Sequence, residues 1–182
     1  MLIQSPSPSR APKGKATSGD APSGKGLRIA IVAARYNESL VDALLDCTRR
    51  SLAVSGVRHP LTVRVPGSYE IPCVVMRLAR SRRFHALIAL GMILQGKTSH
   101  ADHIAMACAI HLQRIAVETG IPVIHQILTP RTLRDARARI SPRGVEAAQA
   151  AIEMAAIVGN LKCKMGNGKF KIFNHGSSKP SA

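Results

Sequence analysis

The sequence is poor in aromatic and acidic side chains. Its 182 residues include no Trp, two Tyr and three Phe, and only 10 acidic residues accompany 26 Lys and Arg. Without more aromatic side chains, a surface that stacks single-stranded bases is not expected. The shortage of acids leaves a formal charge of +16, so anions are the expected partners. Charge alone leaves two alternatives open: solvated basic tails or a nucleic-acid-binding role.

Long apolar runs and paired cysteines are also missing. No run reaches the roughly 18 residues of a membrane span, so no membrane partner is expected. The first 26 residues lack the apolar core of a signal peptide, which predicts a cytoplasmic protein. Four cysteines without CxxC spacing are expected to be reduced: Cys47, Cys73, Cys108 and Cys163.

Composition divides the chain into three parts. Residues 5–26 contain almost no large apolar side chain, which predicts a disordered basic extension over residues 1–26. From residue 162 onward the chain is rich in Gly and Lys, which indicates a basic tail over residues 162–182. Residues 27–161 are therefore predicted to form one folded domain.

Within that domain, short apolar runs alternate with amphipathic stretches. Strands are predicted at 27–33, 61–65, 84–91 and 122–128. Helices are predicted at about 38–55, 71–81, 99–119, 131–139 and 143–158. This alternation predicts an α/β fold with a four-stranded parallel sheet and helices on both faces. Ligands of such folds lie outside the carboxyl ends of the strands.

The stretch GMILQGKTSHADH follows the third predicted strand. Gly91 should end the strand, Gly96 should permit a turn, and Ser99 with Asp102 resembles a capping box before a helix that begins near His100. Free N–H groups over residues 96–98 would then favour a phosphate or carboxylate. An ordinary glycine turn into a capped helix is the alternative.

His100 is a candidate proton carrier, because the positive end of the helix should favour its neutral form. A partly exposed histidine in the first turn, without a chemical role, is the alternative. His100 and His103 could also be read as a metal pair, but no further ligands complete a recurrent zinc spacing. In the stretch VPGSYEIP, Ser68 and Glu70 could hydrogen-bond a polyol, or simply belong to a surface turn. Tyr36 could stack on a flat ring, or simply pack at the end of its strand.

Four segments in order resemble 6,7-dimethyl-8-ribityllumazine synthase, the penultimate enzyme of riboflavin synthesis. They are ARYNESLVDALLDC, VPGSYEIP, LGMILQGKTSHADHI with ETGIPVIHQILT, and RGVEAAQAAIEMA, within about residues 27–158. The resemblance implies a flavodoxin-like three-layer sandwich assembled as pentamers, with sites between subunits. It also implies condensation of 5-amino-6-ribitylaminopyrimidinedione with 3,4-dihydroxy-2-butanone 4-phosphate, releasing phosphate and water without a cofactor or metal.

The resemblance assigns roles residue by residue. His100 matches the proton-transferring histidine, residues 96–98 the phosphate loop, and Arg139 the arginine that clamps the phosphate. The other matching positions are implied to contact the ring or the ribityl chain. The full set of implied substrate contacts is Tyr36, Asn37, Ser68, Tyr69, Glu70, Ile93, Leu94, Gln95, Gly96, Lys97, Thr98, His125 and Arg139.

The chain departs from the family pattern at several positions. Gln95 replaces a frequent Arg, Ala101 a common aromatic, and His125-Gln126 a frequent Phe-Gly. Only ISP separates Arg139 from Arg143, shorter than the loop associated with 60-subunit shells. Two alternatives to the enzyme follow. One is a flavin-binding or lumazine-binding paralogue without catalysis, and the other is an oligomeric shell whose basic tails hold nucleic acid.

Overall fold

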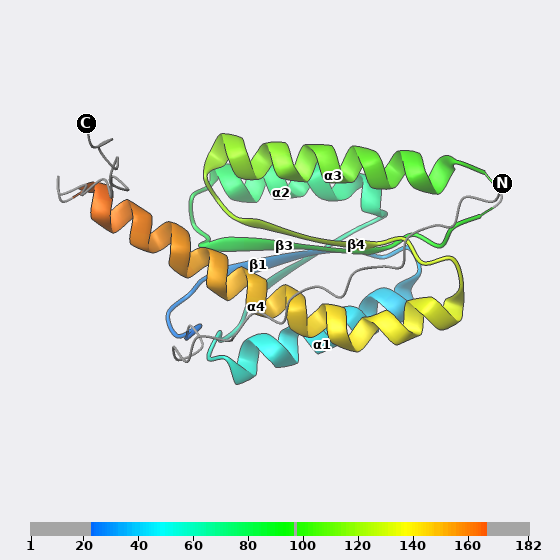
Figure 1. Cartoon of the computed structure of the whole chain (residues 1–182), viewed down its shortest axis with the longest axis horizontal. Coiled ribbons are helices and arrows are strands. Elements are labelled where there is room, and N and C mark those ends of the chain that lie inside the picture. The colour runs from blue at the N-terminus through cyan, green and yellow to red at the C-terminus, as the bar shows by residue number, and fades with distance from the viewer. Residues whose placement is uncertain (1–22, 97, 167–182) are drawn as a thin grey trace, which may run out of the picture.

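The computed structural model describes residues 23–96 and 98–166. Strands and helices alternate along the chain (Figure 1). The strands are β1 (Ile29–Ala34), β2 (Leu61–Val65), β3 (Ala86–Met92) and β4 (Val123–Leu128). The helices are α1 (Glu38–Val54), α2 (Ile71–Arg80), α3 (His100–Thr119) and α4 (Leu133–Gly166), with a short 3-10 turn, η1, over Ser68–Glu70.

The four strands form one parallel sheet in the order β2-β1-β3-β4. The central strands β1 and β3 are buried along their whole length, which explains why their sequences are nearly continuous apolar runs. The edge strands β2 and β4 are partly exposed. The predicted α/β class is therefore confirmed.

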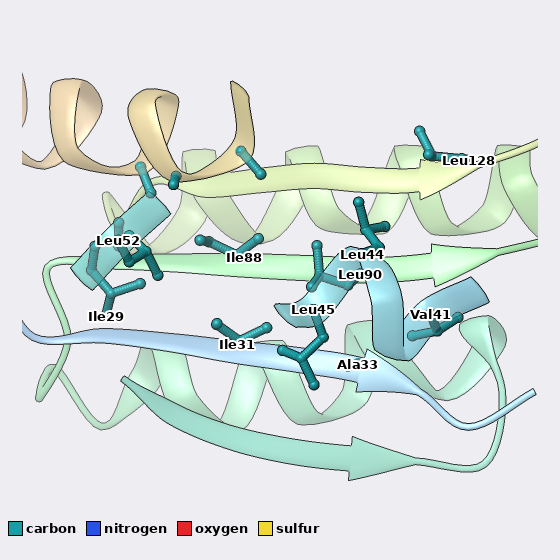
Figure 2. Packing of buried hydrophobic residues seen from close by; sticks show 14 of the residues in the cluster. Ile29, Ile31, Ala33, Val41, Leu44, Leu45, Leu52, Ile88, Leu90 and Leu128 are labelled. Carbon is teal, nitrogen blue, oxygen red and sulfur yellow. The ribbon is translucent and has the colours of Figure 1, made fainter. Parts of the chain in front are cut away.

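Alternate residues of each central strand enter two separate cores. Ile31 and Ile88 pack under α1 and α4, together with Leu44 (Figure 2). On the opposite face, Val32 and Ala89 pack under α2 and α3. Each large side chain buried in this way contributes about 1.5–3 kcal/mol through removal of apolar surface from water.

The two helices predicted at 131–139 and 143–158 are one continuous helix, so that prediction was wrong. Pro142 lies inside α4, although proline removes a helical hydrogen bond and disfavours this position. Side chains of neighbouring elements bond carbonyls on either side of it. Cys47 donates its Sγ–H to the Ser141 carbonyl (3.4 Å), and Gln126 donates its Nε2–H to the Arg143 carbonyl (3.1 Å). Packing on α1 and the sheet therefore outweighs the local preference.

Described residues extend beyond the predicted domain limits at both ends. Gly24 is buried, and its N–H donates to the Ser55 carbonyl (2.8 Å). At the other end, α4 continues past residue 161 to Gly166. The rest of the predicted extension and tail, residues 1–22 and 167–182, lies outside the described residues. No helix in the described part is long and apolar enough to cross a membrane.

Candidate functional site

The loops after the four strands gather at one edge, because the carboxyl ends of parallel strands lie together. Backbone pairing continues past the strands into these loops. The Tyr36 N–H donates to the Pro66 carbonyl (3.0 Å), which joins the loops after β1 and β2. The Ile93 N–H donates to the Leu128 carbonyl (2.8 Å), and the Gln95 N–H to the Pro130 carbonyl (3.1 Å). The loops are thus held in register by the sheet.

Asn37 connects the loop after β1 to the end of β3. Its backbone is left-handed, with φ 58°, a conformation that Asn adopts more readily than most residues. Its side-chain Nδ2–H donates to the Met92 carbonyl (2.7 Å). Its own carbonyl accepts from the N–H groups of Leu40 and Val41 as α1 begins. The amide of Asn37 therefore fixes the loop after β1 to the carboxyl end of β3.

The turn after β2 holds a carboxylate in place. Glu70 accepts a hydrogen bond at Oε2 from the Gly67 N–H (2.8 Å), which leaves its other oxygen free of any hydrogen bond or ion pair within the described residues. Tyr69 is 64% exposed, and Tyr36 on the neighbouring loop is 73% exposed. Two aromatic rings and one anchored carboxylate thus face solvent at this edge.

Ser68 is buried against β3, and this packing was not anticipated from the sequence. A Cβ added to Gly91 would lie 2.4 Å from Ser68 Oγ and 3.2 Å from a methyl of Ile127. Gly91 is therefore needed for close approach, and it lies inside β3 instead of ending it. The only available signal was a glycine within an apolar strand, which often marks such an approach.

Cys108 of α3 lies beneath the same turn. Its Sγ–H donates to the Ser68 carbonyl (3.2 Å). Burial, with a smaller contribution from the Glu70 carboxylate, raises the pKa of the Cys108 thiol to about 11. The thiol stays protonated at neutral pH, so Cys108 supports the turn and does not supply a nucleophile.

The loop before α3, which was predicted to bind phosphate, agrees with the sequence prediction only in part. Gly96 does not have a positive φ, and an added Cβ would meet no described atom within 4 Å, so glycine is not required there within this chain. α3 does begin at His100, which is exposed. However, Ser99 makes no side-chain capping hydrogen bond, so the capping box was wrong. Lys97 lies outside the described residues, and Thr98 is exposed.

Two predicted site residues lie apart from the loops. His125 is in the middle of β4, in register with Ala89, and lies on the α3 side of the sheet between the inward-facing Val123 and Ile127. It is an exposed residue, yet partial burial lowers the pKa of its imidazole. Arg139 is exposed on α4, which packs on the other face. No hydrogen bond or ion pair in the described chain joins Arg139 to the loops.

The site therefore consists, within one chain, of hydroxyl, carboxylate and aromatic groups beside the start of a helix. Ile93 and Leu94 are half-buried on the loop after β3, next to Gln95. In residues 23–96 and 98–166, no three His, Cys, Asp or Glu side chains are grouped as metal ligands would be. This combination defines an α/β protein whose strand ends carry exposed aromatic and carboxylate side chains.

Comparison with known proteins gives the family. The model of the 6,7-dimethyl-8-ribityllumazine synthase family matches residues 26–158. A synthase of that name from Polaromonas sp. is 38% identical over 140 residues, covering 76% of this chain and 91% of the relative. A synthase of the same name from Paraburkholderia phymatum is 41% identical over 134 residues, covering 72% of this chain and 78% of the relative. The chain belongs to the 6,7-dimethyl-8-ribityllumazine synthase family.

Proposed function

We propose that this chain forms 6,7-dimethyl-8-ribityllumazine at the strand-end site, in the penultimate step of riboflavin biosynthesis. The observation that carries the proposal is the family match, which spans all four strands and every loop of the site. The substrates are 5-amino-6-ribitylaminopyrimidinedione and 3,4-dihydroxy-2-butanone 4-phosphate. Holding two substrates in register can lower a barrier by roughly 7–11 kcal/mol.

The ring and the ribityl chain are assigned to the loops after β1, β2 and β3. Tyr36 stacks on the pyrimidine ring, with Ile93 and Leu94 beside it. Ser68, Tyr69 and Glu70 contact the ribityl chain and ring edge, and the Glu70 carboxylate, anchored by the Gly67 N–H, offers its second oxygen to hydroxyl groups. Asn37 contributes mainly by position, because its side-chain N–H is already bonded to Met92.

The phosphate is assigned to the start of α3. Its unpaired N–H groups and dipole favour an anion, and Gln95 through Thr98 lead the chain into that helix. Arg139 provides the guanidinium that clamps the phosphate. His100, the first residue of α3, transfers protons during Schiff-base formation and phosphate loss.

The complete site includes a second copy of this chain, in a pentamer-based assembly. His125 lies on a strand away from the loops of its own chain, so it is assigned to the ring pocket of a neighbouring subunit. The outer face of α3 supports such an assembly, since Met106, Ile110 and Val117 are 63%, 56% and 73% exposed. Burial of these side chains against another copy would be favourable.

The two-substrate reaction tests the activity directly. Purified protein mixed with both substrates should produce the absorbance of the lumazine product, and omission of either substrate should abolish it. A folded oligomer that yields no product would contradict the proposal. If that oligomer bound riboflavin tightly, it would be the non-catalytic paralogue instead.

His100 can be tested against its neighbour His103, which is also exposed on α3. Removal of a general acid or base typically slows a reaction about 10²–10⁴-fold. His100→Ala should therefore lower kcat by that order while inorganic phosphate still competes with the butanone phosphate. His103→Ala should leave kcat within about twofold, on the order of 0.4 kcal/mol. Equal effects of the two changes would remove His100 from the reaction.

A further inference from the structure

A second concave surface lies at the amino end of the sheet, opposite the candidate site. A cleft of about 690 Å³ is bordered by the last turns of α1 and by the loop that leads to β2. Figure 2 shows Leu52, near the end of α1, beside Ile29 at the start of β1. The cleft thus lies a full strand length away from the loops assigned to substrates.

The lining of this cleft is strongly basic. Arg49, Arg50 and Arg58 contribute guanidinium groups, His59 an imidazole, and Asp46 is its one carboxylate. None of the three arginines makes an ion pair or side-chain hydrogen bond within the described residues, where the ion-paired arginines are Arg64, Arg114 and Arg143. Several unpaired cations around one cavity repel each other, so an anion bound between them would be stabilised.

Further positive charge continues from the cleft along the same end of the sheet. Lys25 lies against Gly56, whose added Cβ would be 3.4 Å from the Lys25 backbone nitrogen. Arg28 precedes β1 and donates from Nε to the Arg83 carbonyl (2.6 Å) in the loop before β3. Because the amino ends of parallel strands also lie together, these cations extend the positive surface beyond the cleft.

We propose that the cleft and its flanking cations bind the phosphate backbone of a nucleic acid without reading its sequence. Guanidinium groups match phosphate oxygens in a bidentate geometry, and an extended cationic surface suits a repeating polyanion better than a single phosphate. The chain has no Trp, and few aromatic residues in total, so contacts are to phosphates and not to stacked bases. A concave surface fits a strand better than a flat lipid layer.

Anisotropy of a fluorescein-labelled single strand of about 20 nucleotides measures this binding with the full chain over a range of salt concentrations. The variant Arg49→Gln/Arg50→Gln/Arg58→Gln should bind at least about 10-fold more weakly near 0.1 M salt. The slope of log K against log salt should also become shallower by about 2, since each single-strand phosphate contact contributes about 0.7.

Two matched variants locate the site. Arg131→Gln/Arg134→Gln/Arg137→Gln removes the same charge at the opposite end of the molecule, where these arginines are exposed. Arg10→Gln/Lys13→Gln/Lys15→Gln removes it from the N-terminal segment. Both should weaken binding less than the cleft variant, and circular dichroism melting should show that all three variants remain folded.

Several outcomes would overturn the proposal. An equal loss in the α4 variant would mean that only net charge matters. A loss confined to the N-terminal variant would assign binding to that segment. If the cleft variant instead lost affinity for phosphatidylserine vesicles and kept its affinity for the oligonucleotide, the surface would recognise lipid.

Discussion

The helices on the two faces of the sheet are packed to different degrees. On one face, α1 and α4 approach so closely that a Cβ added to Gly144 would lie 2.7 Å from Cys47 Cβ. On the other, α2 and α3 leave a groove of about 450 Å³ that reaches from Tyr69 to Glu118. The contact between α1 and α4 is therefore tight at Gly144, whereas α2 and α3 leave a groove between them. Both faces expose some apolar side chains, among them Ile157 on α4 and Val117 on α3.

The groove and the exposed side chains of α3 support the α2/α3 face as the contact surface of the proposed assembly. Apolar side chains on the outer surface of α3 cover no part of its own core, so their apolar character is unexplained by the folding of one chain. A subunit contact through the α2/α3 face would account for it. The groove also borders Tyr69, so the same contact would place a second subunit beside the proposed substrate site.

The largest expected effect comes from placing a charge on the α2/α3 face. Ile110→Asp should dissociate the proposed oligomer, because a carboxylate would be buried without a partner. Val54→Asp is the control at the end of α1, where Val54 is the most exposed large apolar side chain among the described residues. It should leave assembly intact. Light scattering distinguishes the two. Unchanged mass for Ile110→Asp would show that α3 is not the interface.

A smaller effect is expected from closing the tight contact on the α1/α4 face. Gly144→Ala forces its new methyl against Cys47 Cβ and the backbone nitrogen of Thr48, and overpacking of this kind costs about 1–3 kcal/mol. Gly159→Ala on the same helix meets nothing within 4 Å among described atoms. It should raise the free energy of unfolding by about 0.5–1 kcal/mol. Urea denaturation measures both, and equal signs would contradict the difference in packing.

The smallest effect concerns His125 on the α3 side of the sheet. Because its pKa in the folded chain is below the usual 6.5, the unfolded chain binds a proton more readily between the two values. The contribution of His125 to the free energy of unfolding should be fully present above pH 6.5. It should be lost as the pH falls from 6.5 through the lowered pKa of the folded chain. Urea denaturation at about pH 5 and pH 7.5 should show a smaller decline for His125→Gln than for the natural chain. An identical decline would separate His125 from the pH response.

Much of the fold could be predicted because its signals are local. Apolar runs indicated the buried strands β1 and β3, and amphipathic spacing indicated α1, α2 and α3. The failure at α4 has a clear cause: Pro142 is a strong local breaker, and only contacts from distant residues such as Cys47 and Gln126 offset it. Sequence patterns within a short window carry no information about such contacts.

The candidate site also has features that the sequence predicts and features that depend on distant contacts. The sheet topology makes the strand-end loops converge, so their meeting was predictable. The burial of Ser68 against Gly91 was not predictable, because it depends on two elements that are separated in the sequence. Gly96 showed the opposite error, since a glycine in a loop suggested a conformational need that the backbone does not have.

Asn37 limits which side chains evolution or design could place at the first loop. Glycine would adopt its left-handed backbone easily but would lose the 2.7 Å link to Met92. Aspartate would keep the size of the side chain but would present an acceptor to a carbonyl that already accepts. Leucine would satisfy neither demand. A single position thus couples the local backbone of one loop to the end of β3, and asparagine is the side chain that meets both requirements.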